Sequence, residues 1–172
     1  MRPHLFSAIA VAGLAPLLGC GSDVVVGAAQ LHVRGSEVAI APAGRPEAVV
    51  REDGSLFVGG TAVALSEATR AQLVGYNTAA RARVQHGLAT GRAGAAVAAS
   101  AASEVAKGLA GGDISQIGAK VEAKADDVRQ AAVKICDDLA AMRVAQEAAA
   151  ASVEAFRPYA VVADSEVKDC HR

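Results

Sequence analysis

One repeat in the C-terminal half of the chain constrains the fold more than any other feature. From Ile117 to Phe156, apolar side chains recur at steps of three and four residues. This spacing places them on one stripe of a helix and is typical of a helical hairpin or coiled coil. Pro158 breaks helices, so we expect this helix at residues 113–157. Its stripe comprises Ile117, Val121, Ala125, Val128, Ala132, Ile135, Leu139, Met142, Ala145, Ala149, Val153 and Phe156.

The stripe needs a partner, and residues 66–110 predict one. Ser66 is suited to cap a helix N-terminus, and Glu67 follows in the first turn, where the helix dipole favours an acid. A break between Gly87 and Gly94 stays open, because glycine weakens helices. The same spacing of three and four recurs at Leu73, Tyr76 or Asn77, Ala80, Val84, Leu88, Ala95, Ala98, Ala102, Val105 and Leu109.

Ahead of the hairpin, residues 30–65 predict a small antiparallel sheet of about four strands. Polar and apolar residues alternate in Gln30–Arg34 and again in Glu37–Ile40. Gly59-Gly60 separates two β-prone runs and suits a tight hairpin turn. One face of this sheet needs covering, so we expect a single α+β domain at 30–172: the sheet packed on the hairpin, then a polar, extended tail at 158–172.

The amino terminus has the features of an export signal. A basic start and a short apolar run precede Leu17-Leu18-Gly19-Cys20, which resembles the bacterial lipobox. We therefore expect a lipoprotein signal peptide at 1–19, lipidation of Cys20, and a tether at 20–29. Gly21-Ser22 follows the cysteine, with no aspartate directly after it. By resemblance to Gram-negative lipoprotein sorting, this implies the periplasmic side of the outer membrane rather than retention in the inner membrane. The alternative is ordinary cleavage near Gly19, with Cys20 unmodified.

The remaining two cysteines predict a disulfide bond. An exported chain with three cysteines leaves one unpaired, unless Cys20 carries lipid and Cys136 pairs with Cys170 in the oxidising periplasm. The tail is long enough to return along the second helix, since about 14 extended residues reach roughly 46 Å.

No catalytic or metal-binding pattern accompanies these features, and we expect neither an enzyme nor a cofactor. His4, His32, His86 and His171 lack the spacing of metal ligands. Asp126-Asp127 and Asp137-Asp138 are interpreted as solvated acids. A net charge of −1, from 17 basic and 18 acidic residues, argues against nucleic acid as a partner.

Two features of the first helix suggest surfaces for partners. Arg81, Arg83, His86 and Arg92 form a modest basic patch, suited to anionic lipid or peptidoglycan or merely to solvent. A row of small residues predicts close helix packing within or between subunits, with membrane insertion as the alternative. The row comprises Gly87, Gly91, Ala95, Ala99 and Ser103.

Several short motifs resemble the YggN-like family of bacterial envelope proteins. They are Asp53-Gly54-Ser55-Leu56-Phe57-Val58-Gly59-Gly60, Val63-Ala64-Leu65-Ser66, Leu73-x-x-Tyr76, Ile135-Cys136-Asp137-Asp138-Leu139, Gln146 and Cys170. The resemblance spans residues 30–170. It implies residence in the periplasm, and it transfers no activity and no catalytic residue.

These observations together predict a non-enzymatic envelope lipoprotein that acts through protein interaction or structural support. The membrane would hold it through the N-terminal lipid, and a protein partner or a second copy would bind the helix seam. The alternative is a module that binds a small ligand or lipid in a groove between sheet and hairpin.

Overall fold

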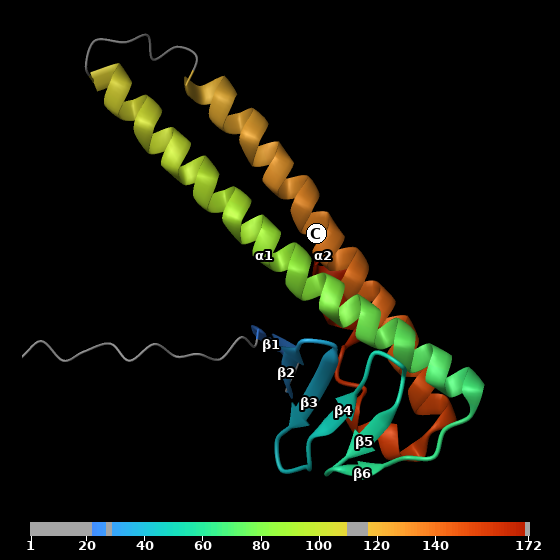
Figure 1. Cartoon of the computed structure of the whole chain (residues 1–172). Coiled ribbons are helices and arrows are strands. Elements are labelled where there is room, and N and C mark those ends of the chain that lie inside the picture. The colour runs from blue at the N-terminus through green and yellow to red at the C-terminus, as the bar shows by residue number, and fades with distance from the viewer. Residues whose placement is uncertain (1–21, 27–28, 110–116, 171–172) are drawn as a thin grey trace, which may run out of the picture.

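The computed structural model describes residues 22–26, 29–109 and 117–170. A small antiparallel sheet packs under one end of two long helices, whose other end projects beyond it (Figure 1). The predicted α+β arrangement of an antiparallel sheet on a helical hairpin is confirmed.

The sheet has six strands that pair in chain order, each antiparallel to the next. This order explains why short turns join the strands. The strands are β1 (Ser22–Val26), β2 (Ala29–Arg34), β3 (Glu37–Pro42), β4 (Ala48–Val50), β5 (Leu56–Val58) and β6 (Thr61–Ala62).

The segment predicted as a tether, 20–29, contains strand β1, so that prediction is wrong at Ser22–Val26. All five residues of β1 pair with β2, from Ser22 opposite Val33 to Val26 opposite Ala29. The physical reason is the run Val24-Val25-Val26, because β-branched residues favour extended backbone. The sheet therefore begins two residues after Cys20.

Side chains along each strand point alternately to the two faces of the sheet, and those on one face form rows across the strands that pack against the helices. Ile40 lies between Leu31 and Ala48, and all three are almost fully buried. The next row, with Val38, Val50 and Leu56, is equally buried. The predicted covered face of the sheet is thus the face toward the helices.

Two turns depend on glycine. Gly59 and Gly60 have φ of 55° and 79°, as expected for the predicted turn, which joins β5 to β6. Gly54 has φ 77°, and a Cβ there would lie 2.2 Å from the carbonyl oxygen of Arg70. Only glycine lets this turn approach the first helix so closely.

The two long helices are α1 (Glu67–Leu109) and α2 (Ile117–Ser152). Ser66 caps α1 as expected, since its Oγ accepts the Thr69 N–H at 3.1 Å. Helix α1 runs without the break considered at Gly87–Gly94. Helix α2 ends earlier than predicted, because Val153 adopts extended backbone before the 3-10 helix η1 (Glu154–Tyr159).

The core lies where the helices cross the sheet. Side chains of both helices and of η1 close over the strands, and Tyr76 meets Phe156 edge to face with ring centroids 5.9 Å apart. The helical residues of this apolar core are Leu73, Tyr76, Ala79, Ala80, Leu139, Met142, Ala149, Phe156 and Tyr159.

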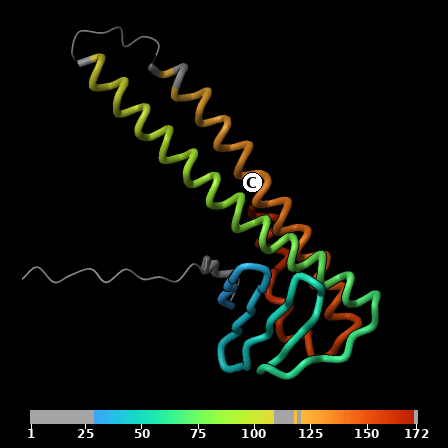
Figure 2. The backbone as a smooth tube through the Cα atoms, viewed as in Figure 1, coloured from blue at the N-terminus to red at the C-terminus, as the bar shows by residue number. Residues whose placement is uncertain are grey.

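Beyond the sheet and α3, the hairpin packs only on itself within the part of the chain that the structure describes (Figure 2). Its 43-residue first helix is about 65 Å long at 1.5 Å per residue. The α2 stripe from Val121 to Ile135 is half-buried there rather than buried. No helix within the described ranges is long and apolar enough to cross a membrane.

The C-terminal segment differs from the extended tail that we expected. After η1 it forms a short helix, α3 (Asp164–Cys170), that lies against α2. The acids Asp164 and Glu166 occupy its first turn and Lys168 its last, which suits the helix dipole. Local charge placement therefore makes this segment helical although it is polar.

Candidate functional site

The two cysteines predicted to pair lie at disulfide distance. The Sγ atoms of Cys136 and Cys170 are 2.07 Å apart and their Cα atoms 5.5 Å apart. Cys136 is buried on α2, and Cys170 is the last residue of α3. The bond attaches the C-terminal end of the chain to the middle of the hairpin.

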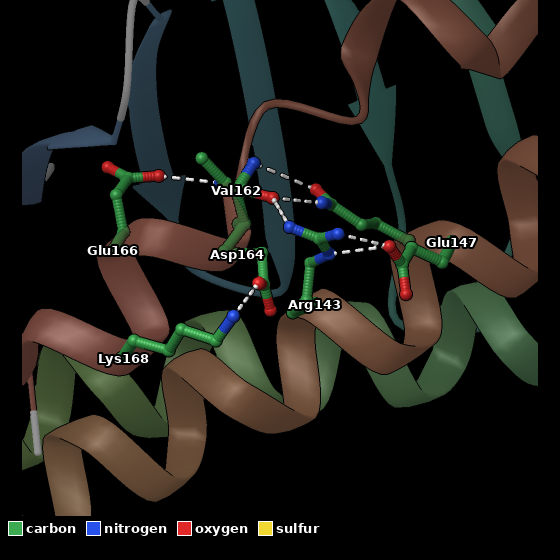
Figure 3. A network of polar contacts seen from close by, with 8 residues as sticks. Arg143, Glu147, Val162, Asp164, Glu166 and Lys168 are labelled. Carbon is green, nitrogen blue, oxygen red and sulfur yellow. Dashed lines mark hydrogen bonds and ion pairs between the residues drawn. The ribbon is translucent and has the colours of Figure 1, made fainter.

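A polar clamp on α2 holds the beginning of the same segment (Figure 3). Gln146 uses both ends of its amide: Nε2 donates to the Val162 carbonyl at 2.6 Å, and Oε1 accepts the Val162 N–H at 3.0 Å. Arg143 donates a further hydrogen bond to that carbonyl at 3.1 Å, and Glu147 orients the Arg143 guanidinium. The backbone of Val162 is thereby fully satisfied in a buried position.

Charged residues stabilise α3 from within. Glu166 reaches back and accepts the Ala163 N–H at 2.7 Å. Figure 3 shows the Glu166 carboxylate turned toward the chain next to Val162. The hydrogen bond and charge of Lys168 hold the pKa of Asp164 below its usual value. None of the side chains of α3 is fully buried, so the clamp and the disulfide supplement the half-buried contact of Val167 with the core.

Beside α3, two basic residues of α1 meet acids from other elements. His86 Nδ1 lies 2.6 Å from the carboxylate of Asp138 on α2. Burial lowers the pKa of Arg83, and the charges of Glu166 and Asp138 oppose that effect. The predicted basic patch is therefore partly neutralised within the chain; Arg81 likewise pairs with Glu52 at 2.8 Å.

Sequence reasoning missed the roles of Gln146 and the His86–Asp138 pair. We interpreted Asp138 as a solvated acid, but its side chain is only 16% exposed. For Gln146 a signal was present: it follows Leu139 and Met142 at steps of three and four, so a polar residue occupies a core position. Such a residue must find buried partners.

The other described residues that we considered for catalysis or metal binding do not form a cluster. Asp126 pairs with Arg129 on the surface of α2. Among the described residues, no three His, Cys, Asp or Glu side chains come close enough to hold a metal ion. Cys20, His4 and His171 lie outside the described residues, as does the predicted signal peptide.

The small-residue row on α1 does not mediate packing within the chain. Gly91, Ala95, Ala99 and Ser103 are exposed, and a Cβ added at Gly91 would meet nothing within 4 Å. Helix α2 packs on another side of α1. There a shallow depression of about 190 Å³ is lined by Ala93, Ala96, Val97, Lys124, Asp127 and Val128.

The outer face of the sheet carries a second depression, of about 240 Å³. Arg51 stacks over the Phe57 ring at 4.3 Å and pairs with Glu37 at 2.9 Å. The ion pair balances the charges of Arg51 and Glu37, and the cation–π contact covers part of the Phe57 ring.

The fold and these surfaces define an α+β protein with a projecting helical hairpin and a cysteine-attached C-terminal helix. The chain belongs to the family described as "Protein of unknown function (DUF2884)", whose model matches residues 25–116. No curated protein and no solved structure matches the chain.

Proposed function

We propose that this protein is a non-enzymatic envelope lipoprotein that acts through protein interaction or structural support, with the projecting hairpin as its working surface. The observation that carries the proposal is the state of α1 beyond the sheet. There Leu88 is 49% and Val105 51% exposed, on a helix surface that is rich in alanine and glycine. Apolar surface left open on a long projection is typical of a site for a partner.

The proposed anchor is a lipid on Cys20, on the periplasmic side of the outer membrane. The lipobox-like Leu17-Leu18-Gly19-Cys20 supports it, and so does the pairing of the other two cysteines, which suits an oxidising compartment. The resemblance to YggN-like proteins points to the same compartment. Because β1 starts at Ser22, the folded part would sit within about 7 Å of the lipidated residue along the chain.

Ligand binding between sheet and hairpin was the alternative, and no observation favours it. Side chains from both layers fill that interface, among them Ile40, Leu73 and Met142, each 0% exposed.

Two measurements on protein from its native host test the proposal. Mass spectrometry should find Cys20 acylated as the first residue, and an unacylated amino terminus would contradict the anchor. Cross-linking in intact envelopes should join the hairpin to a protein. Ala95→Glu, on the open side of α1, should abolish that product, whereas the matched change Ala123→Glu, on the exposed side of α2, should leave it. Equal loss in both variants, or in neither, would contradict the role of α1.

A further inference from the structure

Six exposed residues of α1 form a second apolar stripe, which we call the outer face of α1. From Leu88 they recur at steps of three, four, three, four and three residues, the spacing of a coiled-coil seam. All six are exposed, and the side of α1 that packs on α2 does not include them. The outer face comprises Leu88, Gly91, Ala95, Ala98, Ala102 and Val105.

The outer face continues an interface that is already occupied. Nearer the start of α1, the same stripe passes through Leu73, Asn77 and Ala80, which are buried against the sheet. Asn77 fixes that contact by donating to the carbonyls of Ser36 and Val50, each at 2.9 Å. The sheet ends while the stripe runs on, so one continuous packing surface is covered over only part of its length (Figure 1).

The pattern of large and small side chains on the outer face is the same in both directions. Large side chains, Leu88 and Val105, stand at its ends, and small ones fill the four positions between. A two-fold axis between residues 96 and 97 would place Leu88 opposite Val105 of a second copy, and Ala95 opposite Ala98. A surface that matches itself in this way suits an isologous contact between identical chains.

Size favours a helix over lipid as the occupant. Glycine and alanine bury little apolar area each, so the middle of this face gains little from a bilayer. The same residues let two helix backbones approach closely, where van der Waals contact becomes extensive. A second copy presents small residues at the matching positions, so that the two backbones can approach closely in register.

We propose that two copies of this protein associate through the outer faces of their α1 helices, antiparallel, with Ala95 of each against Ala98 of the other. This inference deepens the proposed function, on which it rests, by naming the partner of the hairpin. The face is about 27 Å long and about 10 Å wide. It is smaller than the roughly 800 Å² per partner of a stable interface, so the dimer is weak in solution. Anchoring both copies in one membrane would raise their effective concentration.

Sedimentation equilibrium of the full chain in non-ionic detergent tests this register. The wild type should show a concentration-dependent monomer–dimer equilibrium. Ala95→Glu and Ala98→Lys, each alone, should raise the dissociation constant at least about tenfold, because each buries an unpaired charge. The dissociation constant of an equimolar mixture of the two variants should return to within about threefold of the wild-type value, because in the mixed dimer the two new charges face each other.

Ala123→Glu on α2 is the matched control and should leave the dissociation constant unchanged. Circular dichroism establishes that each variant is folded.

Three results would overturn the inference: a wild type that stays monomeric, association that ignores both variants, or a mixture that does not recover. A monomer whose outer face binds phosphatidylglycerol vesicles, with binding lost in Ala95→Glu, would assign the face to lipid and likewise overturn it. Each result leaves the acylation and cross-linking tests of the proposed function unaffected, since a different envelope protein could still bind the hairpin.

Discussion

At the scale of single residues, some buried polar groups of the described residues find hydrogen-bond partners and others, among them the Tyr76 hydroxyl, do not. Asn77 and Gln146 each satisfy backbone groups of a distant segment. The hydroxyl of Tyr76 is fully buried and has no hydrogen-bond partner, and burial raises the pKa of this phenol. Its ring packs well while its oxygen contributes nothing favourable.

We therefore expect Tyr76→Phe to leave the free energy of unfolding unchanged or to raise it by up to about 2 kcal/mol. Tyr159→Phe is the matched control, because the Tyr159 hydroxyl donates to the Pro46 carbonyl at 2.8 Å. Its loss should lower the free energy of unfolding by about 1 kcal/mol. Urea denaturation measures both values. If Tyr76→Phe destabilises more than Tyr159→Phe, the buried hydroxyl has a role that this structure does not explain.

At the scale of elements, α3 shows how a polar segment is kept in place without a core of its own. Its first residues follow the clamp on Val162, and its last residue is Cys170. A disulfide across 34 residues mainly reduces the conformational entropy of the unfolded chain. In the loop-entropy model this stabilises the folded protein by about 3–4 kcal/mol.

Cys170→Ser should therefore lower the free energy of unfolding by up to about 4 kcal/mol, with a matching loss when the wild type is reduced. The remaining Cys136 is tolerated as a small buried apolar residue. Thermal unfolding of oxidised, reduced and variant protein provides the measurement. Equal stability of all three forms would mean that the clamp alone holds α3.

At the scale of the whole molecule, stability should fall along the hairpin away from the sheet. Near the sheet, α1 and α2 carry fully buried residues such as Leu73 and Met142. Farther out, the residues between the helices are small and half-buried, for example Ala93 and Ala125. Fewer apolar contacts per turn mean lower free energies of local opening.

Hydrogen exchange measured by mass spectrometry should show this gradient. At low protein concentration, amides of 90–106 and 121–133 should exchange at least about tenfold faster than those of 73–84 and 139–150. With rising concentration, protection should increase in 90–106 more than in 121–133, because only α1 carries the outer face. Uniform protection along both helices would contradict the gradient.

Periodicity predicted the elements that depend on local pattern. The α2 stripe, the Ser66 cap and the Gly59-Gly60 turn all follow from spacings within a few residues, where backbone geometry responds directly to side-chain type. At Ser22–Val26 the run Val24-Val25-Val26 favours extended backbone, but pairing with β2 makes this short run a strand.

The sequence by itself determined that apolar stripes exist on both long helices, that a small sheet precedes them, and that two cysteines are available to pair. Only the tertiary structure decided which part of each stripe is covered. Leu73 and Leu88 occupy equivalent positions in the α1 pattern, yet one is buried and the other 49% exposed. The reason is geometric: the sheet is shorter than the helix, and periodicity records which residues share a face, not what lies against it.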